Sequence, residues 1–305
     1  MRVIVAGGAG FIGSHINKFL LDSGHQVKVI DNLSTGSTDN IDPRAEFEQV
    51  DLSDQKATEN SIRGFDVVIH LANSIIVPES VEKPVDYAEN NVVNTVKLLE
   101  AMNNTGVKKI IFSSSATVYG ETDKLPLVED SPAGIQTNQY GASKVAMEAF
   151  ISVYHKLYNF DVIHLRYFNP FGPNENHKPE THAIPNFIRA TLKKEPIPLY
   201  WKGEQIRDFI YVEDLAEAHV AVLNLSGHHI FNVGTETGTK IIDTVKKIFE
   251  IVGYEVEIRD LGQRLGDTQA TYASSKKLMS ETSWRPKTSF EDGLRKTIEY
   301  YKKER

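Results

Sequence analysis

Three side chains that could move a proton are spaced across the middle of the sequence. Ser115 ends a run of three serines after an apolar segment, and Tyr140 and Lys144 follow 25 residues later at the expected start of a helix. Because residues four apart share one helix face, the Tyr140 hydroxyl and the Lys144 amine would lie together. A tyrosine is a weak base at neutral pH, so about 4 kcal/mol must come from nearby groups. The three residue types predict acid–base chemistry at a carbinol, with Ser115 aligning the reacting oxygen.

The Tyr-x-x-x-Lys spacing is not specific by itself, because it recurs at Tyr272 and Lys276. Only the first pair follows a hydroxyl-rich strand end, and ligands of α/β proteins bind beyond the carboxyl ends of the strands. The alternatives are structural, since Ser115 could cap a strand end and Lys144 could be a solvated helix lysine. We predict that Ser115, Tyr140 and Lys144 are the catalytic residues.

A glycine-rich turn near the N-terminus has the spacing of a phosphate-binding loop. Gly7, Gly10 and Gly13 lie between an apolar strand and a helix. Glycines there permit a tight turn, close approach of the backbone to a pyrophosphate and close helix packing, and the helix N-terminus then faces the phosphates. Asp31 ends the second expected strand, where a carboxylate accepts ribose hydroxyls and repels a 2′-phosphate. The motif predicts a dinucleotide site that favours NAD over NADP.

The residues after Asp31 fit the same cofactor. The segment 32–36 contains no arginine that could hold a 2′-phosphate, and Asp51 and Leu52 follow the third expected strand, where they could flank an adenine. For Asp51, the alternative is a helix cap. With NAD beside Tyr140, the carbinol would lose a proton to the tyrosine and a hydride to the nicotinamide.

Short apolar runs alternate with helical stretches along the first half of the chain. The expected strands are 3–6, 27–30, 47–50, 67–71, 110–112 and 162–165, and the clearest helices are 11–21, about 86–103 and 142–158. This alternation is typical of a doubly wound parallel sheet. After Phe168, prolines and glycines predict a smaller, loop-rich lobe. We predict an α/β fold with a Rossmann-type doubly wound sheet in residues 1–168, rejoined by about 206–234, and a smaller C-terminal α+β substrate-binding lobe in 169–205 and 235–305.

The composition limits the possible functions. The chain has 305 residues with 40% hydrophobic and 25% charged residues, enough for one large and one smaller domain. A formal charge of −7 gives no electrostatic footprint for nucleic acid. The sequence has no run of about 18 apolar residues, so we expect no membrane span. The absence of cysteine and the lack of zinc-type histidine spacing predict no metal site, and we expect a cytoplasmic protein.

Five strings of the sequence resemble one enzyme family. They are Gly-Gly-Ala-Gly-Phe-Ile-Gly-Ser-His (7–15), Asp-Asn-Leu-Ser (31–34), Ser-Ser-Ser-Ala-Thr-Val-Tyr-Gly (113–120), Tyr-Gly-Ala-Ser-Lys (140–144) and Arg-Tyr-Phe-Asn-Pro (166–170). They look like the UDP-sugar 4-epimerases, which belong to the extended short-chain dehydrogenases/reductases, and the resemblance spans nearly the whole chain. It implies a tightly held NAD that oxidises the sugar at C4, rotation of the 4-keto intermediate and return of the hydride to its opposite face. The enzyme would be an isomerase and, like its relatives, a homodimer paired through helices 86–103 and 142–158.

Together, the motifs and the resemblance define an expected NAD site. Its residues are Gly7, Gly10, Phe11, Ile12, Gly13, Asp31, Asn32, Leu33, Ser34, Thr35, Gly36, Asp51, Leu52, Leu71, Ala72, Asn90, Ser113, Tyr140, Lys144 and Phe168.

The resemblance also implies a UDP-sugar site. Asn169, Arg207 and Arg264 would meet the phosphates and Asp267 the uridine ribose, because arginine forks match phosphate oxygens and a carboxylate accepts two hydroxyls. Without the resemblance, both arginines would be taken for surface charges. The full expected set is Ser115, Tyr140, Asn169, His182, Ala183, Arg207, Arg264, Asp267 and Thr271.

Thr271 bears on the choice of sugar. Strict glucose-type relatives have a bulky tyrosine at this position, which closes the space beside the C2 substituent. Threonine would leave the space open, so we expect UDP-GlcNAc and UDP-GalNAc to be accepted as well as UDP-Glc and UDP-Gal.

Other functions remain open on the same residues. Dehydratases and decarboxylases of this fold place an acid just after the active serine or threonine, where this chain has Ala116 and Thr117, so elimination is disfavoured. A UDP-glucuronate 4-epimerase or a simple dehydrogenase would keep all three catalytic residues. A non-catalytic dinucleotide sensor is the non-enzyme alternative.

Overall fold

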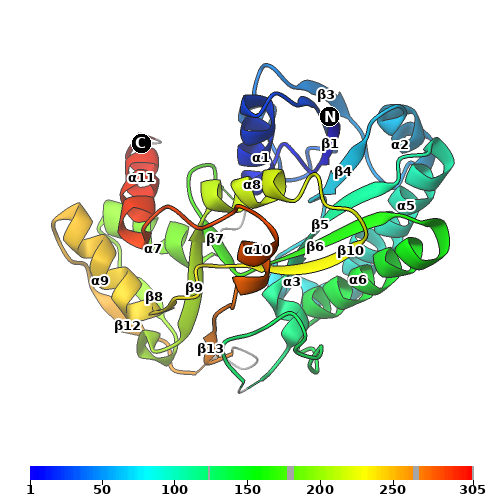
Figure 1. Ribbon diagram of the computed structural model, residues 1–305. Helices are drawn as coiled ribbons and strands as arrows, with labels where there is room; N and C mark the ends of the chain where they lie inside the picture. Colours follow the sequence, from blue (N-terminus) through cyan, green and yellow to red (C-terminus); the bar gives the residue numbers. More distant parts are fainter. Residues whose placement is uncertain (123, 177–181, 264–267, 304–305) are drawn as a thin grey trace.

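A seven-stranded parallel sheet forms the larger lobe of the computed structural model, which describes residues 1–122, 124–176, 182–263 and 268–303 (Figure 1). The spatial order is β10-β6-β5-β4-β1-β2-β3. The strands are β1 (Arg2–Ala6), β2 (Gln26–Asp31), β3 (Glu46–Gln49), β4 (Val67–His70), β5 (Lys109–Ser115), β6 (Asp161–Tyr167) and β10 (His228–Val233). The order reverses between β1 and β4, which is where doubly wound sheets bind ligands. The predicted doubly wound sheet is confirmed.

Both faces of the sheet are covered, because alternate side chains of each strand point to opposite sides. Val3 and Val5 join one apolar core, and Ile4 and Ala6 join the other. The first core is completed by helices α1 (Phe11–Asp22) and α8 (Val212–Ala221), and the second by α2 (Gln55–Ile62), α5 (Asn94–Thr105) and α6 (Gln139–Tyr158).

The expected helix 86–103 has an irregular middle. It consists of α4 (Pro84–Tyr87), a π-helical segment η2 (Ala88–Val93) and α5, and it is preceded by the short helix α3 (Val77–Glu82). Single π-helical turns widen a helix locally and occur often at functional sites. Here the widened turn carries Asn90 and Asn91, whose side chains form hydrogen bonds with Ser74 in the loop after β4.

The smaller lobe lies beside the carboxyl ends of the large sheet and has its own core (Figure 1). Its four-stranded sheet contains β7 (Asn169–Phe171), β9 (Ile206–Tyr211), β11 (Gly238–Lys240) and β13 (Ala270–Thr271), and a separate pair joins β8 (Ile197–Leu199) to β12 (Ile258–Asp260). Its helices are α7 (Ala183–Lys193), α9 (Ile241–Val252) and α11 (Phe290–Lys303), while α10 (Lys276–Glu281) packs on β10. The remaining short turns are η1 (Thr38–Asn40), η3 (Ala116–Tyr119) and η4 (Trp201–Gly203).

The segment 206–234 is divided between the lobes. Strand β9 pairs with β7, β11 and β13 of the small sheet, whereas α8 packs on α1 and β10 pairs with β6 of the large sheet. The chain therefore crosses between the lobes several times. Within the described residues, no helix has the length and apolar character needed to cross a membrane.

Candidate active site

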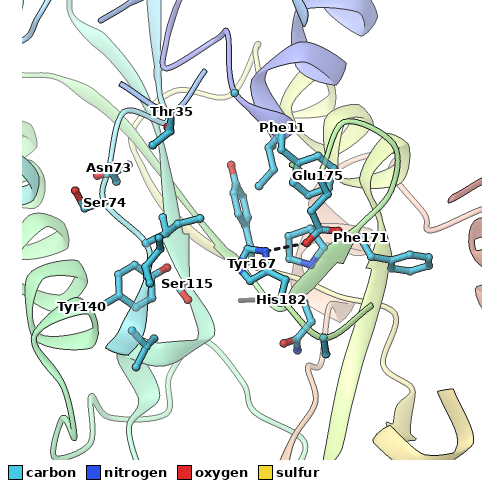
Figure 2. A pocket seen from close by; sticks show the side chains of 18 of the residues that line it. Phe11, Thr35, Asn73, Ser74, Ser115, Tyr140, Tyr167, Phe171, Glu175 and His182 are labelled. Atoms are coloured by element: carbon cyan, nitrogen blue, oxygen red, sulfur yellow. Dashed lines mark hydrogen bonds and ion pairs between the residues drawn. The ribbon is translucent and has the colours of Figure 1, made fainter. Parts of the chain in front are cut away.

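A cavity of about 950 Å³ lies between the two lobes, at the carboxyl ends of the large sheet's strands. Figure 2 shows Ser115 and Tyr140 on one of its sides and His182 and Glu175 on the other. The predicted residues that line it are Gly7, Gly10, Phe11, Ile12, Gly13, Asp31, Asn32, Ser34, Thr35, Asp51, Leu52, Leu71, Ala72, Asn90, Ser113, Ser115, Tyr140, Lys144, Phe168, Asn169, His182, Ala183 and Arg207. Leu33, Gly36 and Thr271 lie outside this lining, and Arg264 and Asp267 lie outside the described residues.

The glycine loop packs closely against its neighbours, which is possible only because Gly7 and Gly13 lack side chains. Gly7 has a φ of +83°, and a Cβ there would lie 2.7 Å from the amide nitrogen of Ala72. A Cβ on Gly13 would lie 2.6 Å from the carbonyl oxygen of Gly7, so α1 can approach the loop closely only without one. Gly36 likewise packs directly against Ala9, where a Cβ would lie 2.9 Å from the Ala9 carbonyl carbon. Its role is therefore to permit this close packing beside the cavity.

Asp31 is held at the end of β2 with its carboxylate at the cavity. Its Oδ2 accepts from the Ala9 amide at 3.0 Å, and its Oδ1 accepts from the Leu33 amide at 2.8 Å. These bonds fix the carboxylate and leave acceptor capacity for ribose hydroxyls. The cradle of glycines, the N-terminus of α1 and this carboxylate together fit NAD.

Asp51 is not a helix cap. The cap of α2 is Asp54, whose Oδ1 accepts from the Ala57 amide at 3.0 Å. Asp51 instead accepts from Asn32 Nδ2 at 2.9 Å and from the Ser53 amide at 2.8 Å, and the bond from Asn32 is the main cause of its lowered pKa. A charged Asp51 therefore lies at the rim where the adenine is expected.

The three predicted catalytic residues are brought together from β5 and α6. Asn138 caps α6 by accepting from the Gly141 amide at 2.9 Å, and this sets Tyr140 and Lys144 in its first two turns. Lys144 Nζ donates to the carbonyl oxygen of Ser113 at 2.6 Å. The Ser115 side chain lies close enough to Tyr140 to act on the pKa of its hydroxyl. Ser115 Oγ also caps η3 by accepting from the Thr117 amide at 3.2 Å, while the residue lines the cavity.

Burial dominates the electrostatics of the pair on α6. It lowers the pKa of Lys144 to about 7, against the opposing charge of Glu148. It raises the pKa of Tyr140, and the Ser115 side chain offsets only part of that rise. The neighbours within the chain thus do not lower the tyrosine pKa by themselves.

The loop after β4 is a part of the site that the sequence did not predict beyond Leu71 and Ala72. Asn91 accepts from the Ser74 amide at 2.7 Å and donates to Ser143 Oγ at 2.9 Å, which ties the loop to α6. Tyr87 Oη binds both backbone groups of Ile76. The π-helical turn that aims Asn91 at the loop has no signature in the hydrophobic pattern.

The small lobe supplies the other wall. Asn169 Nδ2 donates to the carbonyl oxygen of Asp208 at 3.2 Å, and His182 Nδ1 lies 2.8 Å from Glu175 Oε1 (Figure 2). Thr271 pairs directly with Arg207 in the parallel β9–β13 register. It is therefore adjacent to a lining residue although it is outside the lining itself.

The fold and the site define a dinucleotide-binding enzyme with a tyrosine–lysine pair at the carboxyl edge of a doubly wound sheet. The model of the family described as the NAD dependent epimerase/dehydratase family matches residues 3–234, and the chain belongs to this family.

Similar proteins narrow the class further. A UDP-glucose 4-epimerase of Corynebacterium glutamicum is 38% identical, with 94% of this chain and 91% of that protein covered. The UDP-glucose 4-epimerase of Thermus thermophilus, solved with NAD, is 36% identical with a TM-score of 0.92 over 99% of each chain. A UDP-N-acetylglucosamine 4-epimerase of Methanobrevibacter ruminantium, solved with UDP-N-acetylmuramic acid, is 35% identical with a TM-score of 0.94 over 100% of this chain and 99% of that one. The predicted resemblance, the isomerase class and NAD as cofactor are confirmed.

Proposed function

We propose that the protein reversibly inverts C4 of a UDP-hexose through a transient 4-keto sugar. The observation that carries the proposal is the meeting of Ser115, Tyr140 and Lys144 at a cavity whose other end is a dinucleotide cradle. The small lobe adds Asn169 and Arg207 to the opposite wall, where a UDP moiety would bind.

The chain's own residues would handle the proton of the C4 hydroxyl. Tyr140 Oη would take this proton and later return it, and Ser115 Oγ would hold the C4 oxygen in line with it. Lys144, fixed by the Ser113 carbonyl, would favour the phenolate of Tyr140 when charged. NAD, when bound, supplies the positive charge and the hydride acceptor at C4. The walls of the cavity would exclude water while the 4-keto sugar rotates to present its opposite face.

Incubation of the protein with UDP-Glc and an excess of NAD tests the proposal. UDP-Gal should form until the two epimers reach equilibrium, with no lasting rise in absorbance at 340 nm. A steady rise would indicate a net dehydrogenase, and conversion of UDP-glucuronate alone would indicate a uronate epimerase. No turnover with any UDP-sugar would favour the dinucleotide sensor.

We further propose that the enzyme accepts UDP-GlcNAc and UDP-GalNAc. The similarity to a UDP-N-acetylglucosamine 4-epimerase supports this, as does Thr271 beside Arg207. Thr271→Tyr should reduce the ratio of kcat/KM for UDP-GlcNAc to that for UDP-Glc by at least about 10-fold, because a steric block at C2 affects only the larger sugar. Thr271→Ser is the matched control and should keep the ratio. An unchanged ratio in the tyrosine variant would refute the proposed role of Thr271 in the choice of sugar.

We also propose a homodimer that pairs the outer faces of α4 and α6. Val85 on α4 and Leu157 on α6 are 65% and 64% exposed, and Phe150 and Val153 continue the apolar stripe of α6 at helical spacing. An exposed apolar face of this kind suits a second copy of the same chain. Leu157→Glu should yield a monomer in sedimentation analysis, whereas Ile135→Glu, at an exposed apolar loop position, should leave the dimer intact. A dimer that persists in the Leu157 variant would contradict the proposal.

A further inference from the structure

The catalytic residues come from two elements, so their geometry depends on how α6 is attached to the end of β5. Two hydrogen bonds from consecutive strand residues make this attachment. The Ser113 carbonyl accepts from Lys144 Nζ at 2.6 Å, and Ser114 Oγ donates to Glu148 Oε1 at 2.5 Å. Glu148 lies one helical turn after Lys144 and two turns after Tyr140, so all three share one face of α6.

Glu148 is itself clamped by a buried arginine of the neighbouring strand. Arg166 on β6 donates to Glu148 through Nε at 3.0 Å and through Nη2 at 2.8 Å. Ser114 and Arg166 are directly paired in the β5–β6 register, so the carboxylate is held over both strands at once. The Glu148 and Arg166 side chains are only 12% and 9% exposed. A charge-assisted bidentate pair with this little freedom fixes orientation as well as distance.

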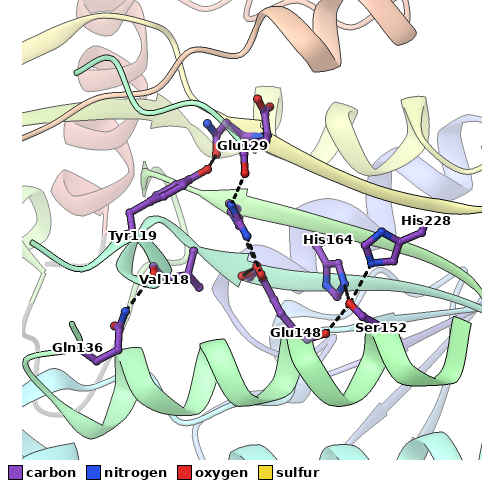
Figure 3. Close-up of polar contacts among 11 residues, drawn as sticks. Val118, Tyr119, Glu129, Gln136, Glu148, Ser152, His164 and His228 are labelled. Carbon is purple, nitrogen blue, oxygen red and sulfur yellow. Dashed lines mark hydrogen bonds and ion pairs between the residues drawn. The ribbon is translucent and has the colours of Figure 1, made fainter. Parts of the chain in front are cut away.

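Contacts with Glu129 and Tyr119 hold Arg166 in turn. Figure 3 shows Tyr119, Glu129 and Glu148 in this region. Its Nη1 donates to the carbonyl oxygen of Glu129 at 3.1 Å, and its guanidinium lies 4.8 Å from the ring centre of Tyr119. Tyr119 Oη donates to Asn232 Oδ1 at 2.6 Å, and the Asn232 amide donates to Glu129 Oε1 at 2.8 Å. The network thus joins the carboxyl end of β5, the middle of α6, β6 and β10.

We propose that Glu148 is a positioning residue for the reaction, which sets Tyr140 and Lys144 against Ser115 by fastening α6 to the end of β5. Glu148 is absent from the cavity lining, whereas its partner Ser114 is part of it, so Glu148 acts on the cavity through its neighbours. Its carboxylate also opposes the effect of burial on the Lys144 charge, and the bonds from Arg166 keep the pKa of Glu148 low despite burial. This inference rests on the proposed function.

Two variants remove different parts of the attachment. In Ser114→Ala, the bond between β5 and α6 is lost, while Glu148 keeps both bonds from Arg166 and the ion pair survives. In Glu148→Gln, Oε1 can still accept from Ser114, but the amide nitrogen cannot accept from Arg166 Nη2. Each should lower kcat for UDP-sugar epimerisation by about 10- to 100-fold, because small misplacements of reacting groups are costly. KM should change less than about twofold, with NAD retained.

Asp214→Asn is the matched control for loss of a buried carboxylate. Asp214 is 3% exposed and accepts from the Lys287 and Thr288 amides, away from the cavity. This variant should lower the melting temperature while kcat stays at the wild-type value. An unchanged kcat in the Ser114 variant, or a fall in kcat no greater than in the control, would overturn the inference.

Crystal structures of the NAD-bound wild-type and Glu148→Gln proteins separate this inference from the proposed function. The wild type should keep the Lys144–Ser113 bond and the Ser115–Tyr140 contact, and the variant should lose at least one of them. A variant that keeps both would refute the positioning role. A wild type that converts no UDP-sugar would refute the proposed function, while these two structures would still decide what Glu148 holds in place.

Discussion

Replacing Tyr140 with phenylalanine is expected to lower kcat for UDP-sugar epimerisation by about 10³-fold, within the range that general acid–base residues contribute. The variant loses the hydroxyl that would take the C4 proton beside Ser115. The ring remains, so NAD should stay bound. Turnover is measured by separating the C4 epimers, and bound NAD by its release on denaturation.

Tyr272→Phe is the control for this variant, because Tyr272 and Lys276 repeat the same spacing outside the cavity lining. It should leave kcat at the wild-type value. A Tyr140 variant that keeps more than about a tenth of the activity would exclude the tyrosine as the acid–base residue, given the size of such effects.

Acidification from pH 7 to pH 5 is expected to lower the free energy of unfolding by about 5 kcal/mol through three buried histidines. Burial lowers the pKa of His70 to about 3 and those of His164 and His219 to about 4. All three are fully buried in the folded protein. Below the ordinary histidine pKa of 6.5, the unfolded chain binds protons that the folded chain does not, so stability is lost as pH falls.

Urea unfolding at pH 7, 6 and 5 measures this dependence. The free energy should fall most steeply between pH 6 and pH 5. In His164→Gln, where an uncharged side chain replaces one of the three, the pH-dependent loss should shrink by about a third. A stability that does not change between pH 7 and pH 5 would show that these histidines are protonated in the folded state.

The sequence predicted the parts of the fold that local patterns encode. Alternating apolar runs located the strands of the large sheet, and the glycines after β1 located the cradle, because a turn without side chains is a local requirement. The π-helical turn at 88–93 could not be predicted, since one extra residue in a helical turn leaves the apolar spacing almost unchanged. The cytoplasmic location expected from the composition stays a prediction.

The sequence did not predict most contacts between residues that are far apart in the chain. Thr271 pairs with Arg207, and Arg166 with Glu148, through strand register and helix packing. Hydrophobic periodicity specifies which face of an element is buried, but it does not specify which other element covers that face. Resemblance to the family supplied the substrate-wall residues, and the assignments of Arg264 and Asp267 concern positions outside the described residues.

Strand β10 lies at the edge of the large sheet but comes after β7 and β9 of the small lobe in the sequence, and this order has a consequence for biosynthesis. Its partner β6 ends at Tyr167, but the register pair of His228 with Val162 requires a segment made after β7 and β9 of the small lobe. During translation, β6 therefore waits as an open edge, able to pair with another chain, until about 60 further residues have left the ribosome. The seven-stranded sheet of the larger lobe therefore cannot be completed before the first part of the small lobe has been synthesised.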